Sequence, residues 1–266
     1  MRVLLADITI GQYVAGDSFL HRLDPRTKIG MTTVFVVVMF VIRTWWGYLA
    51  GALAVAASLA VARLSPRWVL RGLRPIVVLI AISTLLNAFW TEGTVIWEWG
   101  PLHLTAEGLN KAAMLGVRLV LLVAGAAVLT LTTSPIDLTD ALQRLLRPTR
   151  RLGVPAHELA MMMSIALRFV PTLMEEADRI MKAQMARGAA FDRGGLVARA
   201  RSLIPLLVPL FVSAFRRADE LALAMEARCY RGGEGRTKFR VLHMARADWT
   251  TLVLFTAAAA GVAVWL

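Results

Sequence analysis

The sequence predicts an all-α polytopic membrane protein with about five transmembrane helices and a helical cytoplasmic region. Three observations lead to this fold class. The hydrophobic share of the 266 residues is 58%, above the roughly 45–50% that is usual in soluble domains. Apolar runs long enough to span a bilayer recur along the chain. The 30 lysine and arginine residues mostly flank or separate these runs, as they do in loops retained on the inner side of a membrane.

Composition also narrows the function classes. The formal net charge of +12 would suit nucleic acid binding, but no basic stripe with interleaved aromatics is present, so we expect no nucleic-acid partner. Cys229 is the only cysteine, which excludes an intrachain disulfide and a multi-cysteine metal site. We also expect no cleavable signal peptide, because Asp7 and Asp17 interrupt the first twenty residues.

The first two membrane helices are expected between residues 25 and 62. Asp24 and Pro25 suit an N-cap and a first helical position, because Asp accepts orphan N–H groups and Pro lacks one. The run from Ile29 to Ala62 is almost wholly apolar. Its 34 residues exceed the roughly 17–25 of one span. Two tightly joined helices are therefore predicted, with Trp45 and Trp46 at the outer interface.

Two further spans follow a basic segment. Four arginines within a dozen residues predict an inside loop; they are Arg63, Arg67, Arg71 and Arg74. A third span is expected from Pro75 to Trp90. The connection after it has no Lys or Arg before Lys111 and should face outward. A fourth span, from about Ala112 to Thr132, contains Arg118 near its outer end, where the insertion penalty is smaller.

Beyond Thr133 the apolar pattern becomes periodic. Residues 134–248 hold 19 basic and 12 acidic residues, which indicates a helical region inside the cell. One helix should start at Ser134 and Pro135, and a longer one should run from Pro155 to Gly188 with a kink at Pro171.

The segment 202–215 is apolar but short, and Pro205 and Pro209 are expected to interrupt its helix. We therefore favour a membrane-skimming element over a further span there. The run from Trp249 to Leu266 is long enough to cross. The predicted organisation is thus a membrane domain at 1–133 with four spans, a cytoplasmic coupling domain at 134–248, and a C-terminal span at 249–266.

Two helix-like segments end in nearly the same short sequence, Ala-x-x-Ala-Arg-small. The first ends at Ala186, Arg187 and Gly188, and the second ends at Ala227, Arg228 and Cys229. The simplest explanation is helix capping, since cations in the last turn are favoured by about 0.3–1 kcal/mol and Gly commonly follows a helix end. Capping explains less well why both ends share two alanines. The alternative is a paired docking role for the two arginines.

With these motifs the sequence resembles a known family, the transmembrane T component (EcfT) of energy-coupling factor transporters. The resemblance covers nearly the whole chain, in order. It rests on His21 to Lys28, Thr132 to Pro135, Ser164 to Leu173, Ala186 to Gly188, and Ala224 to Arg228 through Gly233.

The resemblance implies a scaffold subunit of the cell membrane that binds no cofactor itself. Its implied partners are the lipid bilayer, two cytoplasmic ABC-type ATPases that bind ATP, and a membrane S component that captures a vitamin or metal ion. It also implies that Arg187 and Arg228 dock with acidic groups on the ATPases. Cys229 departs from the family pattern, which has Gly there.

Two alternatives of other classes remain open. A self-contained permease should place ionisable groups inside its spans, and only Arg118 comes close. A membrane enzyme would need a nucleophile with a base, or a metal cluster. No phosphate-cradling Gly-rich loop is present. The four histidines show no metal-ligand spacing; they are His21, His103, His157 and His243.

Overall fold

The computed structural model describes residues 13–91, 93–99, 102–146, 148, 155–189, 191, 195, 201–232 and 243–265. These residues form two compact units. The membrane unit contains the described residues from 13 to 141 and from 243 to 265, and the helix-pair unit contains those from 142 to 232. The predicted domain boundaries at 133 and 248 stay predictions. Each unit is described by itself.

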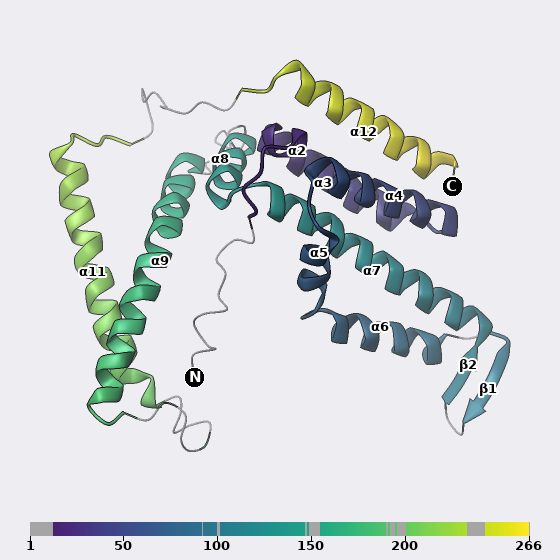
Figure 1. Ribbon diagram of the computed structural model, residues 1–266, viewed down its shortest axis with the longest axis horizontal. Coiled ribbons are helices and arrows are strands. Elements are labelled where there is room, and N and C mark those ends of the chain that lie inside the picture. The colour runs from purple at the N-terminus through teal and green to yellow at the C-terminus, as the bar shows by residue number, and fades with distance from the viewer. Residues whose placement is uncertain are drawn as a thin grey trace. The chain divides into compact units, whose positions relative to one another are not determined.

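The first apolar run forms two helices, as predicted (Figure 1). After the short α2 (Phe19–Arg22), α3 spans Pro25–Val41 and α4 spans Trp45–Ala62. An Asp24 side-chain oxygen accepts the Arg26 N–H at 2.9 Å, with Pro25 in the first turn, so the predicted N-cap is confirmed. A second cap, the Thr44 hydroxyl, accepts the Gly47 N–H at 3.4 Å and restarts the helix after the break.

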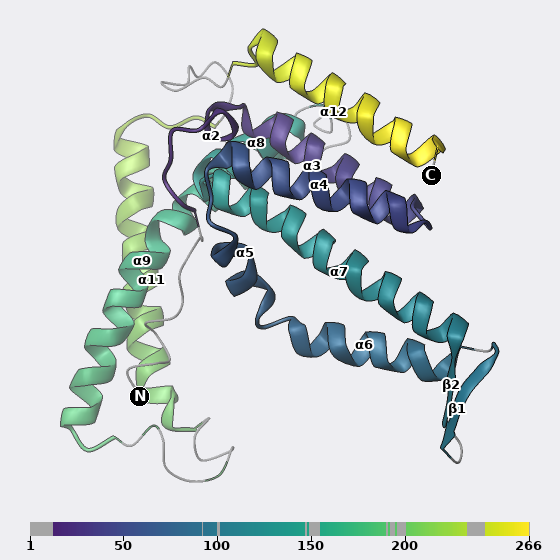
Figure 2. The same ribbon diagram turned by 45° about the vertical axis from the view of Figure 1, so that its right-hand side comes forward.

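The long helix α7 (Ala106–Thr132) is the centre of the membrane unit. Helices α3, α4, α5 and α6 all pack against it, and α12 packs on α3 (Figures 1 and 2). Close packing is set by small residues: a Cβ at Gly125 would lie 2.5 Å from the Phe35 ring. The core is made of buried apolar side chains, which include Phe35, Met39, Ile42, Tyr48, Val55, Leu121 and Leu131.

Two features between α4 and α7 differ from expectation. The arginine-rich segment is a helix, α5 (Pro66–Leu73), because Pro66 suits its first turn and Val69 and Leu73, four apart, bury one face. The connection that was predicted to face outward contains a hairpin of β1 (Val95–Trp99) and β2 (Leu102–Thr105), paired antiparallel. Helix α6 (Val77–Trp90) lies between α5 and this hairpin, and its axis is bent by 66° from that of α5.

The spans can be checked by length and composition. Among the described residues, α4, α7 and α12 (Arg246–Trp265) are long and apolar enough to cross a membrane, and the bent pair α5 and α6 would make a fourth. Helix α3, with 17 residues, meets the minimum of roughly 17–25. The multi-pass, all-helical class is confirmed, and the count of five stays a prediction.

The helix-pair unit is built from α9 (Ala156–Ala186) and α11 (Ile204–Ala227); α8 (Pro135–Leu145) precedes them. The expected interruption by Pro205 and Pro209 is wrong, because α11 runs through both. Pro205 lies in the first turn, where its missing N–H costs nothing. Pro209 leaves the Pro205 carbonyl without a helical donor, and the Gln184 side chain donates to that carbonyl at 3.4 Å.

Candidate coupling site at two helix ends

The candidate site is carried by an antiparallel pair of helices, α9 and α11 (Figures 1 and 2). Arg217 donates to Glu176 at 2.8 Å near the middle of the pair. Gln184, near the end of α9, reaches Pro205 at the start of α11. At the other end, Ile165 and Met225 line one groove. The two helix C-termini therefore lie at opposite ends of the pair.

The first predicted site is a complete Schellman helix end. The Ala189 N–H donates to the Gln184 carbonyl at 3.0 Å, and the Gly188 N–H donates to the Met185 carbonyl at 3.0 Å. Gly188 has φ +90°, with nothing within 4 Å of an added Cβ. These bonds satisfy the last carbonyls of α9 and hold Arg187 as the C-cap. Ala186, Arg187 and Gly188 are all exposed.

The second site repeats the two Schellman hydrogen bonds of the first. The Tyr230 N–H donates to the Met225 carbonyl at 3.0 Å, and the Cys229 N–H donates to the Glu226 carbonyl at 2.8 Å. Cys229 has φ 54° and so adopts the left-handed conformation that Gly188 adopts at the first site. The departure from Gly thus leaves the geometry of Arg228 unchanged. Ala227, Arg228 and Cys229 are exposed.

Cys229→Gly is expected to stabilise the helix-pair unit by about 1 kcal/mol. A side chain in the left-handed conformation costs roughly 1–2 kcal/mol, and Gly returns part of that gain through its larger unfolded-state entropy. Thermal unfolding of the purified chain measures the change. Cys229→Ala is the matched control, because it removes the thiol and keeps the strain. Equal stability of the two variants would contradict the explanation.

Both arginine side chains are exposed on the surface of the helix-pair unit. In the described part of the chain, neither the Arg187 nor the Arg228 guanidinium has an ion-pair or hydrogen-bond partner. Helix α9 has 31 residues, which corresponds to about 46 Å. The arginines are therefore tens of ångströms apart, and the site can bind two separate acidic groups but cannot clamp one. Capping accounts for the backbone of each end and leaves both guanidinium groups available.

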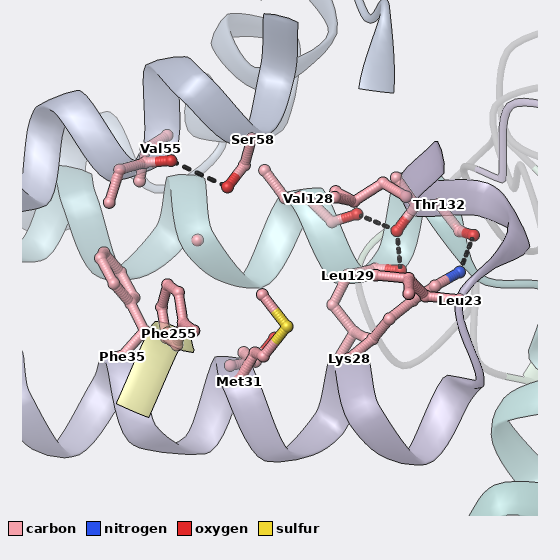
Figure 3. A pocket seen from close by; sticks show the side chains of 14 residues that line it. Leu23, Lys28, Met31, Phe35, Val55, Ser58, Val128, Leu129, Thr132 and Phe255 are labelled. Carbon is pink, nitrogen blue, oxygen red and sulfur yellow. Dashed lines mark hydrogen bonds between the residues drawn. The ribbon is translucent and has the colours of Figure 1, made fainter. Parts of the chain in front are cut away.

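The membrane unit contains a buried polar cluster that sequence reasoning missed. Lys28 is 6% exposed, and its Nζ donates to the Thr132 carbonyl at 2.8 Å and to the His21 carbonyl at 3.2 Å. Asp248 accepts the backbone N–H of Asp24 at 2.7 Å. Figure 3 shows the Lys28 ammonium beside Thr132 at the polar end of a small cavity of about 60 Å³, with Phe35 and Phe255 at the other end.

This cluster lies at the end of α7, after which the chain runs to the helix-pair unit, and at the start of α12, before which the chain returns. Thr132 ends α7, and its carbonyl would otherwise lack a helical donor. Asp248 lies in the first turn of α12 and also accepts the Ala245 N–H at 2.8 Å, as in a capping box. Both crossings are thus fastened to the turn from Asp24 to Lys28. The available signal was Asp248 itself, a lone acid before the last apolar run.

Arg118, the residue that came closest to the permease alternative, makes structural contacts. Its Nη2 donates to the Ile42 carbonyl at 2.9 Å and to the Tyr48 hydroxyl at 2.7 Å. Ile42 lies in the turn between α3 and α4, which was predicted to face outward, and Tyr48 lies in the first turn of α4. Arg118 therefore holds this turn against α7, and the hydrogen bonds offset the cost of the charge.

Arg118→Leu is expected to lower the unfolding free energy by about 2–3 kcal/mol, because it removes charge-assisted hydrogen bonds to two acceptors. Uptake per folded complex, in the assembly that the resemblance implies, should stay unchanged. Unfolding and uptake are both measured, with Tyr48→Phe as a milder control that keeps the charge. Loss of uptake without loss of stability would instead assign Arg118 to a solute pathway.

Comparisons with known proteins find relatives over nearly the whole chain. The family model described as "Cobalt transport protein" (CbiQ) matches residues 16–239. A protein of Thermosediminibacter oceani, named energy-coupling factor transporter transmembrane protein EcfT, is 57% identical over 249 residues, 94% of each chain. Proteins with the same name from Ruminiclostridium cellulolyticum and Listeria innocua are 54% and 46% identical, over 92% and 99% of each chain.

Proposed function

This chain belongs to the family of energy-coupling factor transporter transmembrane proteins, and we propose that it is the scaffold that couples two ATPases to a substrate-capturing membrane subunit. ATP is bound and hydrolysed by the ATPases. The S component binds the transported vitamin or metal ion. The N-terminus and the helix-pair unit lie on the cytoplasmic side in this proposal, in keeping with the 19 basic residues of the segment 134–248.

One observation carries the proposal: the same helix-end geometry occurs twice, with an exposed arginine at opposite ends of one helix pair. Two separated sites with the same helix-end geometry suit two ATPases whose docking surfaces resemble each other. A guanidinium group that docks with a carboxylate and loses water forms a strong charge-assisted hydrogen bond. The described chain offers Arg187 and Arg228 no internal acidic partner that would compete with such docking.

The mechanism follows from this arrangement. Each ATPase holds one end of the α9 and α11 pair, so closure of the ATPases on ATP moves the pair as one body. The pair resists deformation because Arg217 and Glu176 join its helices near the middle. Motion is then passed to the membrane helices through the two chain crossings fastened at Lys28 and Asp248. The S component tilts or is released in response.

The experiment is uptake into proteoliposomes. The chain is reconstituted alone, with its ATPases, and with both ATPases and an S component, and labelled substrate is followed with and without ATP. The proposal predicts uptake only in the complete complex with ATP. Substrate uptake by the isolated chain would overturn it in favour of a permease.

A further inference from the structure

A stripe of arginines runs along the segment between α4 and α6, and the proposed function does not use it. Arg63, Arg67, Arg71 and Arg74 are spaced four, four and three residues apart. Within α5 this spacing places Arg67 and Arg71 on one face, and Arg74 continues it. All four residues are exposed. None of their guanidinium groups has an ion-pair or hydrogen-bond partner in the described part of the chain.

The stripe faces away from the protein core. Val69 and Leu73 are 6% and 8% exposed and belong to the core that packs on α7. Because successive helical residues are about 100° apart, Val69 lies about 200° from Arg67. Helix α5 is thus fixed by one side and presents its arginines on the other.

The backbone conformation of Arg63 supports a role for its charged side chain. Its φ is 55°, the left-handed conformation in which a side chain costs roughly 1–2 kcal/mol. The backbone there only needs to end α4, through N–H bonds from Arg63 to Ala60 and from Leu64 to Leu59, each at 3.0 Å. Gly would do this without strain. A strained residue whose backbone role Gly fills better points to a function of its side chain.

The neighbours of the stripe favour lipid over an acidic protein surface. Trp68 and Leu70 flank the arginines and are 37% and 64% exposed, and the Arg71 guanidinium lies 4.9 Å from the Trp68 ring. Exposed apolar side chains also continue directly into α6, where Val78 is 66% exposed. Tryptophan and arginine together are typical of the headgroup level of a bilayer. An acidic protein surface would satisfy the charges and leave Trp68 and Leu70 without apolar contacts.

We propose that this arginine stripe binds the phosphate groups of anionic phospholipids at the level where α4 ends and α6 begins. The planar guanidinium matches phosphate oxygens with two parallel hydrogen bonds. Each arginine near an anionic membrane surface contributes about a fivefold increase in affinity. The 66° bend between α5 and α6 lets α5 lie along the headgroups while α6 enters the apolar layer.

The test uses the full chain in neutral detergent, with phosphatidylglycerol or phosphatidylcholine added and the bound lipid counted by native mass spectrometry. The variant R67Q/R71Q/R74Q should bind phosphatidylglycerol about 100-fold more weakly and phosphatidylcholine unchanged. The control R22Q/R179Q/R231Q removes the same charge from exposed sites elsewhere and should bind as the wild type does. Equal phosphatidylglycerol binding by the triple variant and the wild type overturns the proposal.

Two further measurements distinguish phospholipid from the other possible ligands of the stripe, which are free phosphate and an acidic protein surface. Inorganic phosphate that displaces phosphatidylglycerol at equal concentration would overturn the proposal in favour of a free-anion site. Loss of ATPase binding by R67Q/R71Q/R74Q with unchanged lipid binding would overturn it in favour of a protein surface. If the triple variant does not fold, the single variants R67Q and R71Q should each show about a fivefold loss. Wild-type lipid binding by both single variants would contradict the proposal as well.

Discussion

Reversing both helix-end charges, with Arg187→Glu and Arg228→Glu, is expected to abolish stable assembly with the two ATPases. Breaking a buried interfacial charge pair costs about 2–5 kcal/mol, a roughly 30- to 5000-fold loss of affinity at each site. The sites are far apart, so the two losses should add. Each single variant should keep one ATPase site and lose the other. Co-purification of the ATPases with each variant measures the effect.

The matched control is Arg179→Glu with Arg201→Glu. These exposed arginines belong to the same unit and have no ion-pair partner among the described residues. The control also makes two Arg→Glu changes, so it changes the net charge by the same amount. Assembly of this control should resemble that of the wild type. If the helix-end variants assemble normally and lose only about 0.3–1 kcal/mol of stability, the arginines are caps and nothing more.

The second large effect is expected from Asp248→Ala. The change removes acceptors of two backbone N–H groups, those of Asp24 and Ala245. It also removes a carboxylate near the buried Lys28. Leaving a buried donor unsatisfied costs about 1–3 kcal/mol, and losing the cap costs about 1 more. We expect a total loss of about 2–4 kcal/mol, which lowers the unfolding midpoint by roughly 10 °C.

Asp248→Asn tests the cause, because the amide keeps one acceptor oxygen and should recover part of the loss. Asp17→Ala is the surface control: this carboxylate is 95% exposed and 3.8 Å from Arg22, so its removal should change stability by less than about 1 kcal/mol. Under the proposed function, Asp248→Ala also uncouples ATP hydrolysis from uptake. Wild-type stability of Asp248→Ala would show that this carboxylate does not fasten α12.

The elements predicted best from the sequence were those that local chemistry specifies. Asp24 with Pro25 and Ser134 with Pro135 begin helices as expected, because capping depends on neighbours in sequence. The two Ala-Arg ends were predicted for the same reason, since a Schellman end is closed within six residues. Their placement at opposite ends of one pair follows from the antiparallel packing of α9 and α11, which no local pattern states.

The features that were not predicted depend on contacts between residues distant in sequence. Lys28 is one of several basic residues at the start of the first membrane helix, and only the fold brings it to Thr132, 104 residues away. The freed carbonyl of Pro205 is satisfied by Gln184 from another helix, which is why proline failed to break α11. Arg118 was placed near the outer end of its span, but its acceptors Ile42 and Tyr48 could not be named from periodicity.

The single native cysteine allows the central claim, docking at both helix ends, to be measured directly. Cys229 is exposed beside Arg228, so its reaction with a maleimide reports access to the second end. Ala186→Cys in a Cys229→Ser chain reports the first end, and Arg179→Cys in the same chain is the control. Adding the ATPases should slow labelling at both ends and leave the control unchanged. Labelling at equal rates in the isolated chain and in the assembled complex would contradict it.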